Sequence, residues 1–449
     1  MQRASGDRPS SAPIRMSIAE ALAERDRTGR PVRVGLVGIG QMGTDIITQT
    51  GQMCGIEVVA AADSVPERAE GAVAIAGGRS RRPQTCLSAG ELSRAIAAGR
   101  LAVTPSAELV CRADEVEVVI DATGRPNTGA RVAMLAIAAR KHMVMMNVEA
   151  DVTVGAYLAA EADAAGVVYT LGAGDEPIAA MELVNFIRGL GYPVIAAGKG
   201  KNNPFRIDAV PDDYRDEAQR RNMNPRMLVE FVDGSKTMVE MVAIANAAGL
   251  VPDVPGMHGP AAPRDELHRY FCPKEEGGLL GRKGVVDFSV APGVAPGVFA
   301  IAEMRHPRVR ERMHDLQLGE GPYYTFYRPH HLTSLEVPLS AAAAVIHREC
   351  HMRSGPVPTA EVGCLAKREL EPGQRLDSIG ECCYRGYSLS RADARARGAL
   401  PLGLAQGATV TRRIGKGELL TYASVAPDPE APIVHLRKAH DARLEALTA

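Results

Sequence analysis

The stretch "VRVGLVGIGQMGTDIITQT", Val32–Thr50, decides the fold of the first part of the chain. Its first six residues are apolar enough to predict a buried strand. The following turn matches G-x-G-x-x-G and consists of Gly38, Ile39, Gly40, Gln41, Met42 and Gly43. A second apolar stretch, "IEVVAAAD", ends at Asp63, about 20 residues after the last glycine of the turn. Strand, glycine turn, helix, strand and acid in this order predict a dinucleotide-binding Rossmann unit.

Each part of this pattern has a physical task. The first glycine permits the tight turn, the second lets a pyrophosphate approach the backbone, and the third lets helix and strand pack closely. Free N–H groups at the helix start bind the phosphates. The Asp63 carboxylate would accept hydrogen bonds from the adenosine ribose hydroxyls, which favours NAD(H) over NADP(H). A 2′-phosphate would need a cation, and the chain offers Arg68 and the basic run "GGRSRRP", although a solvated loop explains that run equally well.

Two further apolar strands are predicted, and each is followed by polar residues. "VEVVIDATGRP" leads to Thr123 and Gly124, and "KHMVMMNVEAD" leads to Asn147 and Glu149. Ligands of doubly wound sheets bind beyond the carboxyl ends of the strands. We therefore expect Thr123, Gly124 and Asn147 at the cofactor and Glu149 beside the substrate.

Composition excludes several classes of protein. The 449 residues carry 52 Lys plus Arg and 53 Asp plus Glu, so the formal net charge is -1 and no global field would attract nucleic acid. The length predicts two or three domains. No apolar run reaches the roughly 20 residues of a membrane span, and the N-terminus has no secretory pattern. Eight scattered cysteines without a C-x-x-C pair indicate a reducing, cytoplasmic location.

The central region contains "GKGKNNP", residues 198–204, at the end of a short apolar strand. Side chains alternate along an extended chain, so Lys199 and Lys201 would point to one face. Lysines stabilise negative charge that develops on substrate oxygens, and they bind phosphate. We expect one lysine in each role, with Asn202 or Asn203 orienting a hydroxyl. The alternative is a surface loop with two solvated lysines.

Other candidates flank this segment. His330 and His331, in "YRPHHLTS", are the best proton-transfer candidates, and Arg328 beside them could bind phosphate. Asp175 and Glu176 stand at a predicted helix start, where capping explains them as well as substrate binding does. Carboxylates such as these could hold Mg²⁺ or Mn²⁺, but no spacing requires a metal.

The fold expected from these patterns is α/β, in three parts. An N-terminal extension with a short helix covers residues 1–30, and a doubly wound Rossmann sheet covers 31–165. A central α+β substrate-binding and dimerisation domain covers 166–355. The last part, 356–449, changes in composition, repeats a strand-turn pattern, and predicts a small β-rich module.

The segments "VIDATGRP" (119–126) and "KHMVMMNVEADVTVG" (141–155), with the glycine turn, resemble the Rossmann domain of homoserine dehydrogenases. Glu149 stands where that family has a lysine, which argues against homoserine as the substrate. The C-terminal "CLAKRELEPGQRL" and "RRIGKGELLTYASV" resemble the SAF module. With "GKGKNNP" between them, the chain resembles the DXR-like (DRL) family, the second type of 1-deoxy-D-xylulose 5-phosphate reductoisomerase.

The resemblance implies an NADP(H)-dependent reductoisomerase that makes 2-C-methyl-D-erythritol 4-phosphate for isoprenoid biosynthesis, and it implies a homodimer. A dehydrogenase of a sugar acid, polyol or homoserine-like compound is the first alternative. A redox-sensing regulator with a vestigial Rossmann domain is the second, and the near-complete fingerprint argues against it.

Overall fold

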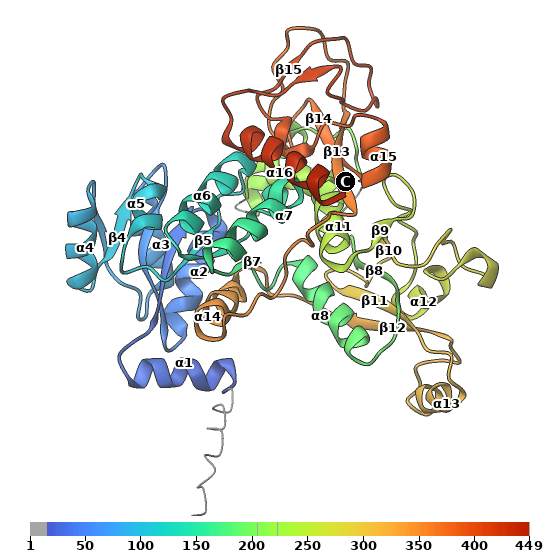
Figure 1. Ribbon diagram of the computed structural model, residues 1–449, viewed down its shortest axis with the longest axis horizontal. Coiled ribbons are helices and arrows are strands. Elements are labelled where there is room, and N and C mark those ends of the chain that lie inside the picture. Colours follow the sequence, from blue (N-terminus) through green and yellow to red (C-terminus); the bar gives the residue numbers. More distant parts are fainter. Residues whose placement is uncertain (1–15, 204, 222, 449) are drawn as a thin grey trace, which may run out of the picture.

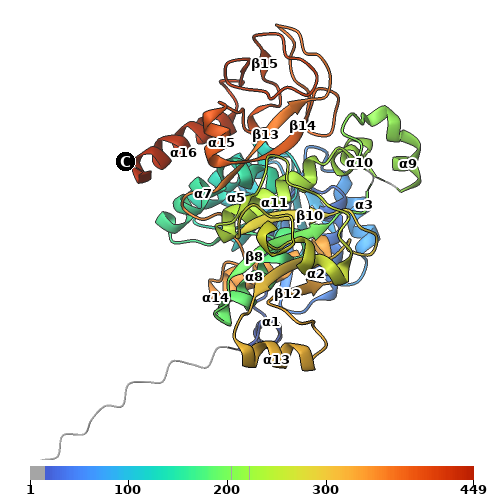
Figure 2. The same cartoon turned by 90° about the vertical axis from the view of Figure 1, so that its right-hand side faces the viewer.

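The computed structural model describes residues 16–203, 205–221 and 223–448. A parallel sheet with its helices lies on the left of Figure 1, and a second sheet lies on the right. The last hundred residues, coloured orange to red, form a small module with short strands that stands at the top of both views (Figures 1 and 2).

The first sheet has seven strands in the order β3-β4-β2-β1-β5-β6-β7, and all of its strand pairs are parallel. The chain leaves β1 towards β2 on one side and later returns to β5 on the other, which is the switch point where ligands of such sheets bind. The predicted doubly wound sheet is therefore confirmed. Its strands are β1 (Val32–Val37), β2 (Ile56–Ala62), β3 (Pro83–Thr85), β4 (Leu101–Thr104), β5 (Val118–Asp121), β6 (His142–Met145) and β7 (Tyr169–Leu171).

Helices cover both faces of this sheet. One core cluster joins the sheet to α1 (Ile18–Arg27), α2 (Gln41–Gln52), α3 (Arg68–Ala76) and α14 (Val337–His347). The opposite face carries α4 (Ala89–Ala97), α5 (Ala107–Arg112), α6 (Pro126–Ala138) and α7 (Val148–Ala165). Helix α14 contacts β1, β5 and β6 although it is far away in the sequence, so a distant segment completes the nucleotide-binding unit.

The second sheet is mixed and has the order β12-β11-β8-β10-β9. Its central strand β8 pairs in parallel with β10 and antiparallel with β11. The strands are β8 (Val194–Gly200), β9 (Val251–Pro252), β10 (Val285–Ser289), β11 (Val298–Glu303) and β12 (Tyr323–Arg328). Helices α8 (Glu176–Gly189) and α11 (Ser235–Ala248) pack against this sheet, so both can direct side chains to the end of β8.

The helical pattern of residues 226–249 forms two helices, α10 (Pro225–Val232) and α11, because Gly234 adopts a left-handed conformation between them. The other helices of the middle region are α9 (Arg215–Arg220), α12 (Leu267–Tyr270) and α13 (Pro307–Asp315). Short 3₁₀ turns are η1 (Pro211–Tyr214), η2 (Arg264–Glu266), η3 (Lys274–Glu276), η4 (Thr333–Leu335) and, later in the chain, η5 (Leu402–Leu404).

The C-terminal module contains two small antiparallel sheets and two helices. The pairs are β13 (Ala360–Ala366) with β14 (Tyr384–Ser390), and β15 (Thr409–Val410) with β16 (Val425–Ala426). Helix α15 (Arg391–Ala396) follows β14, and α16 (Pro432–Thr448) ends the described chain. Helix α16 packs against α6 and α7, and β14 packs against α11. The module is therefore attached to both sheets.

The predicted N-terminal helix is confirmed, together with its capping box. The Ser17 hydroxyl accepts from the Glu20 amide at 3.3 Å, and the Glu20 carboxylate accepts from the Ser17 amide at 2.8 Å. Residues 1–15, which belong to the predicted N-terminal extension, lie outside the described residues. The domain limits 1–30, 31–165, 166–355 and 356–449 stay a prediction. No helix of the described chain has the length and apolarity to cross a membrane.

Candidate active site

The glycine turn lies between β1 and α2, where the sequence predicts it. Gly38 has φ 97°, and a Cβ there would lie 2.8 Å from the Ala122 carbonyl oxygen. A Cβ on Gly43 would overlap the carbonyl oxygen of Gly38, whereas Gly40 has open space around it. Gly40 is also the N-cap of α2 and has no side chain to bind the free N–H groups of the first turn. The turn thus leaves those donors available to a phosphate.

Asp63 follows β2 and is buried, with 9% of its surface exposed. Its carboxylate accepts from the Ile39 amide at 2.7 Å and from the Val65 amide at 2.9 Å. Arg68 lies 3.3 Å from the same carboxylate. The acid is therefore held directly against the glycine turn and is paired with Arg68.

The rest of the basic run lies at the opposite end of the sheet. Arg81 is bonded to Glu57, the second residue of β2, and Arg79 lies 3.6 Å from Asp26. Asp63 is six residue steps after Glu57, a span of roughly 20 Å at about 3.3 Å per residue of strand. The ion pairs of Arg79 and Arg81 explain the run structurally and keep both side chains away from a ribose at Asp63.

The carboxyl ends of β5 and β6 carry a group of buried polar side chains. Asn147 caps α7 by accepting from the Ala150 amide at 3.1 Å. Burial raises the pKa of Asp121 to about 7, although hydrogen bonds from the Thr123 and Asn147 side chains act in the opposite direction. Gly124 follows with φ 61°. Polar side chains at the ends of these strands lie where ligands of doubly wound sheets bind.

Lys199 is the centre of a buried charged cluster. It lies on β8 and is 6% exposed. Its ammonium donates to Glu176 at 2.7 Å and to Glu240. Burial opposes the charge of Lys199, but the two carboxylates outweigh burial and raise its pKa. The surface-loop alternative is therefore wrong for this lysine.

Helix α11 adds two residues that sequence analysis missed, Lys236 and Glu240. The Lys236 ammonium lies 3.4 Å from Glu149 and 3.9 Å from Glu240. Burial, followed by repulsion from Glu176, raises the pKa of Glu240 to about 8. The sequence contains a pattern that could have identified these two residues. Lys236 and Glu240 are opposite charges at i and i+4 in the otherwise largely apolar helix "SKTMVEMVAIANAA".

Glu176 begins α8, and Asp175 is the N-cap of that helix, as the capping interpretation predicts. Burial opposes ionisation of Glu176, but Lys199 and His331 hold its pKa well below the usual value. Burial raises the pKa of Asp175 to about 6. Both residues belong to what we call the central cluster, namely Glu149, Asp175, Glu176, Lys199, Lys236, Glu240 and His331.

Only one of the two adjacent histidines reaches the central cluster. His331 contacts the Gly174 carbonyl through Nδ1 at 2.6 Å, and its Nε2 lies 3.4 Å from Glu176. Burial lowers the pKa of His331, but Glu176 outweighs this and raises it to about 9. His330 is exposed. Because Nδ1 faces a carbonyl, it carries a proton, and Nε2 is the nitrogen available for proton exchange.

Lys201 lies just beyond β8 and is also buried. Its ammonium donates to the Phe231 carbonyl at 2.7 Å and to the Asn203 carbonyl at 3.0 Å. Burial, followed by repulsion from Lys199, lowers its pKa to about 8. Asn202 is exposed, and its side chain accepts from Asn203 at 3.2 Å. The lysines thus lie close enough to repel each other, while Asn202 points to solvent.

Arg328, at the end of β12, is already paired with two carboxylates. It donates to Glu182 at 2.7 Å and to Glu336 at 2.8 Å. These ion pairs connect β12 to α8 and to the segment before α14. The predicted phosphate-binding role of Arg328 therefore requires that an incoming anion compete with Glu182 or Glu336.

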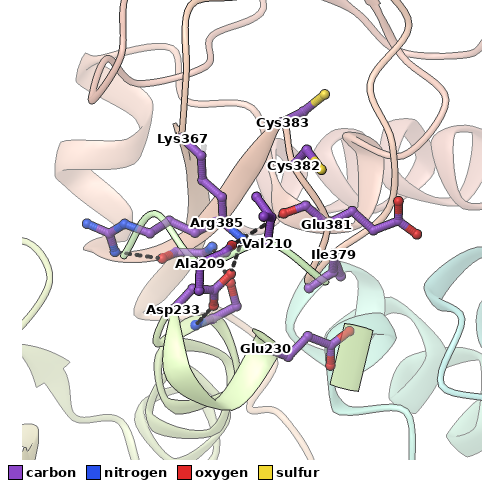
Figure 3. A network of polar contacts seen from close by, with 12 residues as sticks. Ala209, Val210, Glu230, Asp233, Lys367, Ile379, Glu381, Cys382, Cys383 and Arg385 are labelled. Atoms are coloured by element: carbon purple, nitrogen blue, oxygen red, sulfur yellow. Dashed lines mark hydrogen bonds and ion pairs between the residues drawn. The ribbon is translucent and has the colours of Figure 1, made fainter. Parts of the chain in front are cut away.

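A second buried network joins the C-terminal module to the segment beside Lys201 (Figure 3). Lys367 points from the module toward Asp233, which lies 2.6 Å away, and also donates to the Ala209 carbonyl at 2.9 Å. Both charged side chains are at most 2% exposed. Asp233 directly follows α10, whose Phe231 carbonyl binds Lys201. The module therefore helps to fix the backbone that holds Lys201.

Replacing Lys367 by Met should lower the free energy of unfolding by about 3–5 kcal/mol, because Asp233 would be left as a buried unpaired charge. The double variant Lys367→Met/Asp233→Asn should recover part of the loss, since an amide oxygen can still accept from the Ser235 amide. Urea unfolding measures both. Lys416→Met, which breaks an exposed pair with Asp208, is the control and should cost at most about 1 kcal/mol. Equal stability of the Lys367 and Lys416 variants would contradict the prediction.

Comparison with known proteins gives one family match. A model described as the catalytic domain of the oxidoreductase DRL matches residues 174–337. This range contains all of the central cluster except Glu149, and it contains Lys201. No curated protein matches the chain.

Several solved structures are similar to part of the chain. The myo-inositol dehydrogenase of Lactobacillus casei is 14% identical, with 66% of this chain and 74% of that chain covered and a TM-score of 0.37. The scyllo-inositol dehydrogenase of the same organism is 16% identical, with 61% and 73% covered and a TM-score of 0.35. The 1-deoxy-D-xylulose 5-phosphate reductoisomerase of Zymomonas mobilis is 14% identical, with 48% and 57% covered and a TM-score of 0.34.

Proposed function

We propose that the chain is an NADP(H)-dependent reductoisomerase, because a model of the catalytic domain of the oxidoreductase DRL matches residues 174–337. It converts 1-deoxy-D-xylulose 5-phosphate and NADPH, with one proton, into 2-C-methyl-D-erythritol 4-phosphate and NADP⁺. The observation that carries the proposal is the buried Lys199, held by Glu176 and Glu240 at the end of β8. A homodimer and a cytoplasmic location, both expected from the sequence, belong to the same proposal.

The reaction needs stabilised negative charge on substrate oxygens during the skeletal shift. Lys199 and Lys236 are cations fixed in a buried site, where they stabilise an oxyanion without reorganising. Lys201 has no carboxylate partner among the described residues. Its ammonium binds two backbone carbonyls and lies 5.6 Å from the centre of the Phe205 ring, and we assign it to the phosphate. In this proposal the paired Arg328 is a second phosphate contact.

Proton transfer falls to His331 and Glu240. The Nε2 of His331 lies beside Glu176, and its pKa of about 9 keeps it protonated at neutral pH, as a general acid must be. Glu240 has a pKa of about 8 and can hold or release a proton in the same range. Asn202 is exposed and Asn203 is half-buried. In this proposal they orient a substrate hydroxyl only if the segment after β8 moves towards the central cluster when substrate binds.

The nicotinamide cofactor fits the polar side chains at the ends of β5 and β6 and the open glycine turn. Hydride transfer is the chemistry that this cofactor supplies when bound. Asp63 favours NAD(H), whereas the family resemblance favours NADP(H) and Arg68 provides a cation beside the ribose. We therefore propose NADP(H), with the 2′-phosphate contacting Arg68.

A divalent metal has suitable ligands here. Asp175, Glu176 and Glu240 present carboxylate oxygens within 4.8 Å of one another, and Mg²⁺ or Mn²⁺ prefers such oxygens. The ammonium of Lys199 already binds two of these carboxylates, so a metal would compete with it. A metal held by the three carboxylates would act as a Lewis acid on a substrate oxygen.

The test is a turnover assay with the purified chain, 1-deoxy-D-xylulose 5-phosphate, NADPH and Mg²⁺ or Mn²⁺. We expect loss of NADPH absorbance and formation of 2-C-methyl-D-erythritol 4-phosphate in equal amounts, with a higher kcat/KM for NADPH than for NADH. NADPH oxidation with a product that keeps the unbranched skeleton would indicate the plain dehydrogenase instead. A lack of turnover with this substrate, together with reduction of NAD⁺ or NADP⁺ by a polyol or sugar acid, would also contradict the proposal.

A further inference from the structure

A second cavity lies between the C-terminal module and the helices of the first sheet. Its volume is about 270 Å³. Helix α7 contributes Val152 to its wall, β13 contributes Glu361, α15 contributes Arg391 and Arg395, and α16 contributes Arg437 and His440. We call it the module cavity. No residue of the central cluster lines it, so it is separate from the candidate active site.

Charged side chains of both signs line the module cavity, namely Arg391, Arg395 and Arg437 and the acids Glu361, Asp441 and Glu445. Arg437 is matched by two acids, because it lies 2.6 Å from Glu361 and 2.9 Å from Asp441. Among the described residues, the guanidinium groups of Arg391 and Arg395 have no such partner. Burial, followed by repulsion from Arg395 and Arg437, lowers the pKa of Arg391, even though Asp441 and Glu361 act in the opposite direction. Two unpaired guanidinium groups at one cavity fit a carboxylate or phosphate.

Two buried acceptors in the wall also lack a side-chain donor. His440 is 3% exposed, and its Nδ1 lies 3.3 Å from the Thr153 carbonyl. A carbonyl only accepts, so Nδ1 carries the proton and Nε2 is an acceptor, and it has no partner within the described chain. Burial lowers the pKa of His440 to about 4, so the ring is neutral at pH 7. One buried carboxylate oxygen of Glu361 likewise has no side-chain donor within the described chain, and the Val362 amide is the backbone donor to this carboxylate.

We propose that the module cavity binds a small anion that carries hydroxyl groups. Its anionic group would lie on Arg391 and Arg395. Its hydroxyl groups would donate to Nε2 of His440 and to the buried oxygen of Glu361. Unpaired buried acceptors are costly, and a hydroxyl donor removes that cost. The volume, near the lower end of the roughly 300–1,000 Å³ typical of ligand sites, suits a hydroxy acid or a polyol monophosphate of a few carbon atoms.

Titration calorimetry of the full-length chain with D-glycerate and with glycerol 3-phosphate tests this proposal. We expect binding of at least one of them, and the two titrations distinguish a carboxylate from a phosphate ligand. Propionate and n-propyl phosphate, which lack the hydroxyl groups, should bind more weakly. Arg391→Gln and Arg395→Gln should each weaken binding by at least about tenfold, since each removes a charge-assisted contact.

Arg397→Gln is the matched control, because Arg397 is exposed just after α15 and does not line the cavity. It should leave the affinity unchanged. Arg395 is exposed, so its variant should fold even if the half-buried Arg391 proves necessary for folding. Absence of binding by both hydroxylated anions would overturn the proposal. Binding that survives in both arginine variants but is lost in Lys199→Met would also overturn it, because the ligand would then occupy the active site.

Discussion

Replacing Lys199 by Met should lower kcat by about 100- to 1,000-fold, the usual effect of removing one oxyanion-stabilising donor. The proposed function makes the Lys199 ammonium the group that meets charge developing on the substrate. A group that acts only in the transition state affects kcat more than KM. The measurement is steady-state kinetics with 1-deoxy-D-xylulose 5-phosphate and NADPH, at a temperature below the onset of melting of the variant.

The same substitution should also destabilise the protein, because Glu176 and Glu240 would lose their shared cation. Breaking a buried pair costs about 3–5 kcal/mol, and protonation of Glu240, whose pKa is already about 8, would relieve part of this. Lys283→Met removes an exposed lysine paired with Glu303 and is the control. Unchanged kcat in Lys199→Met, with the control also unchanged, would end the assignment of Lys199 to catalysis.

Lys201→Met serves as a second comparison within the same segment. The Lys201 ammonium binds two backbone carbonyls and lies over the Phe205 ring, so its loss leaves no buried carboxylate of the described residues unpaired. If its ammonium holds the substrate phosphate equally in ground and transition states, the variant should raise KM and leave kcat nearly unchanged. The contrast between the two lysines separates a binding contact from a catalytic one.

Replacing Gly40 by Asp should weaken nicotinamide nucleotide binding by at least about 100-fold, since like charges brought together cost several kcal/mol and each 1.4 kcal/mol is about tenfold. The new carboxylate would stand at the N-cap of α2, where we expect the pyrophosphate to bind. Folding should survive, because Gly40 has φ -82° and open space around its Cα. Aspartate is also a favourable N-cap residue. Titration of nicotinamide fluorescence measures the affinity.

Gly40→Ala is the matched control, and it should bind the nucleotide much better than the aspartate variant because it adds no charge. Gly43→Ala should behave differently from both. Its Cβ would overlap the Gly38 carbonyl oxygen, so it should lower the melting temperature. Tight binding by Gly40→Asp would show that the pyrophosphate does not lie on this turn.

The sequence by itself determined the nucleotide-binding unit. The glycines at 38, 40 and 43 and the acid at 63 are local features, because a tight turn, a helix start and a strand end depend on residues within a few positions of one another. The parallel strands follow from continuous apolar runs separated by helices. Burial of Lys199 could not be derived in this way, because a Lys-Asn-rich segment between glycines is equally compatible with a solvated loop.

Only the tertiary structure decided which charged side chains lie together in the central cluster. Lys236 and Glu240 lie on α11, about 40 residues after Lys199, and no spacing rule places them beside β8. The same holds for Glu149, which lies in the first turn of α7 beside the first sheet, and for His331, which was equivalent to His330 in the sequence. Long-range packing of α8 and α11 on the second sheet brings these groups together. Burial also determines the charge states of these groups. The pKa of a buried carboxylate or ammonium depends on its burial and on the charged groups nearest to it in space, not on its neighbours in the sequence.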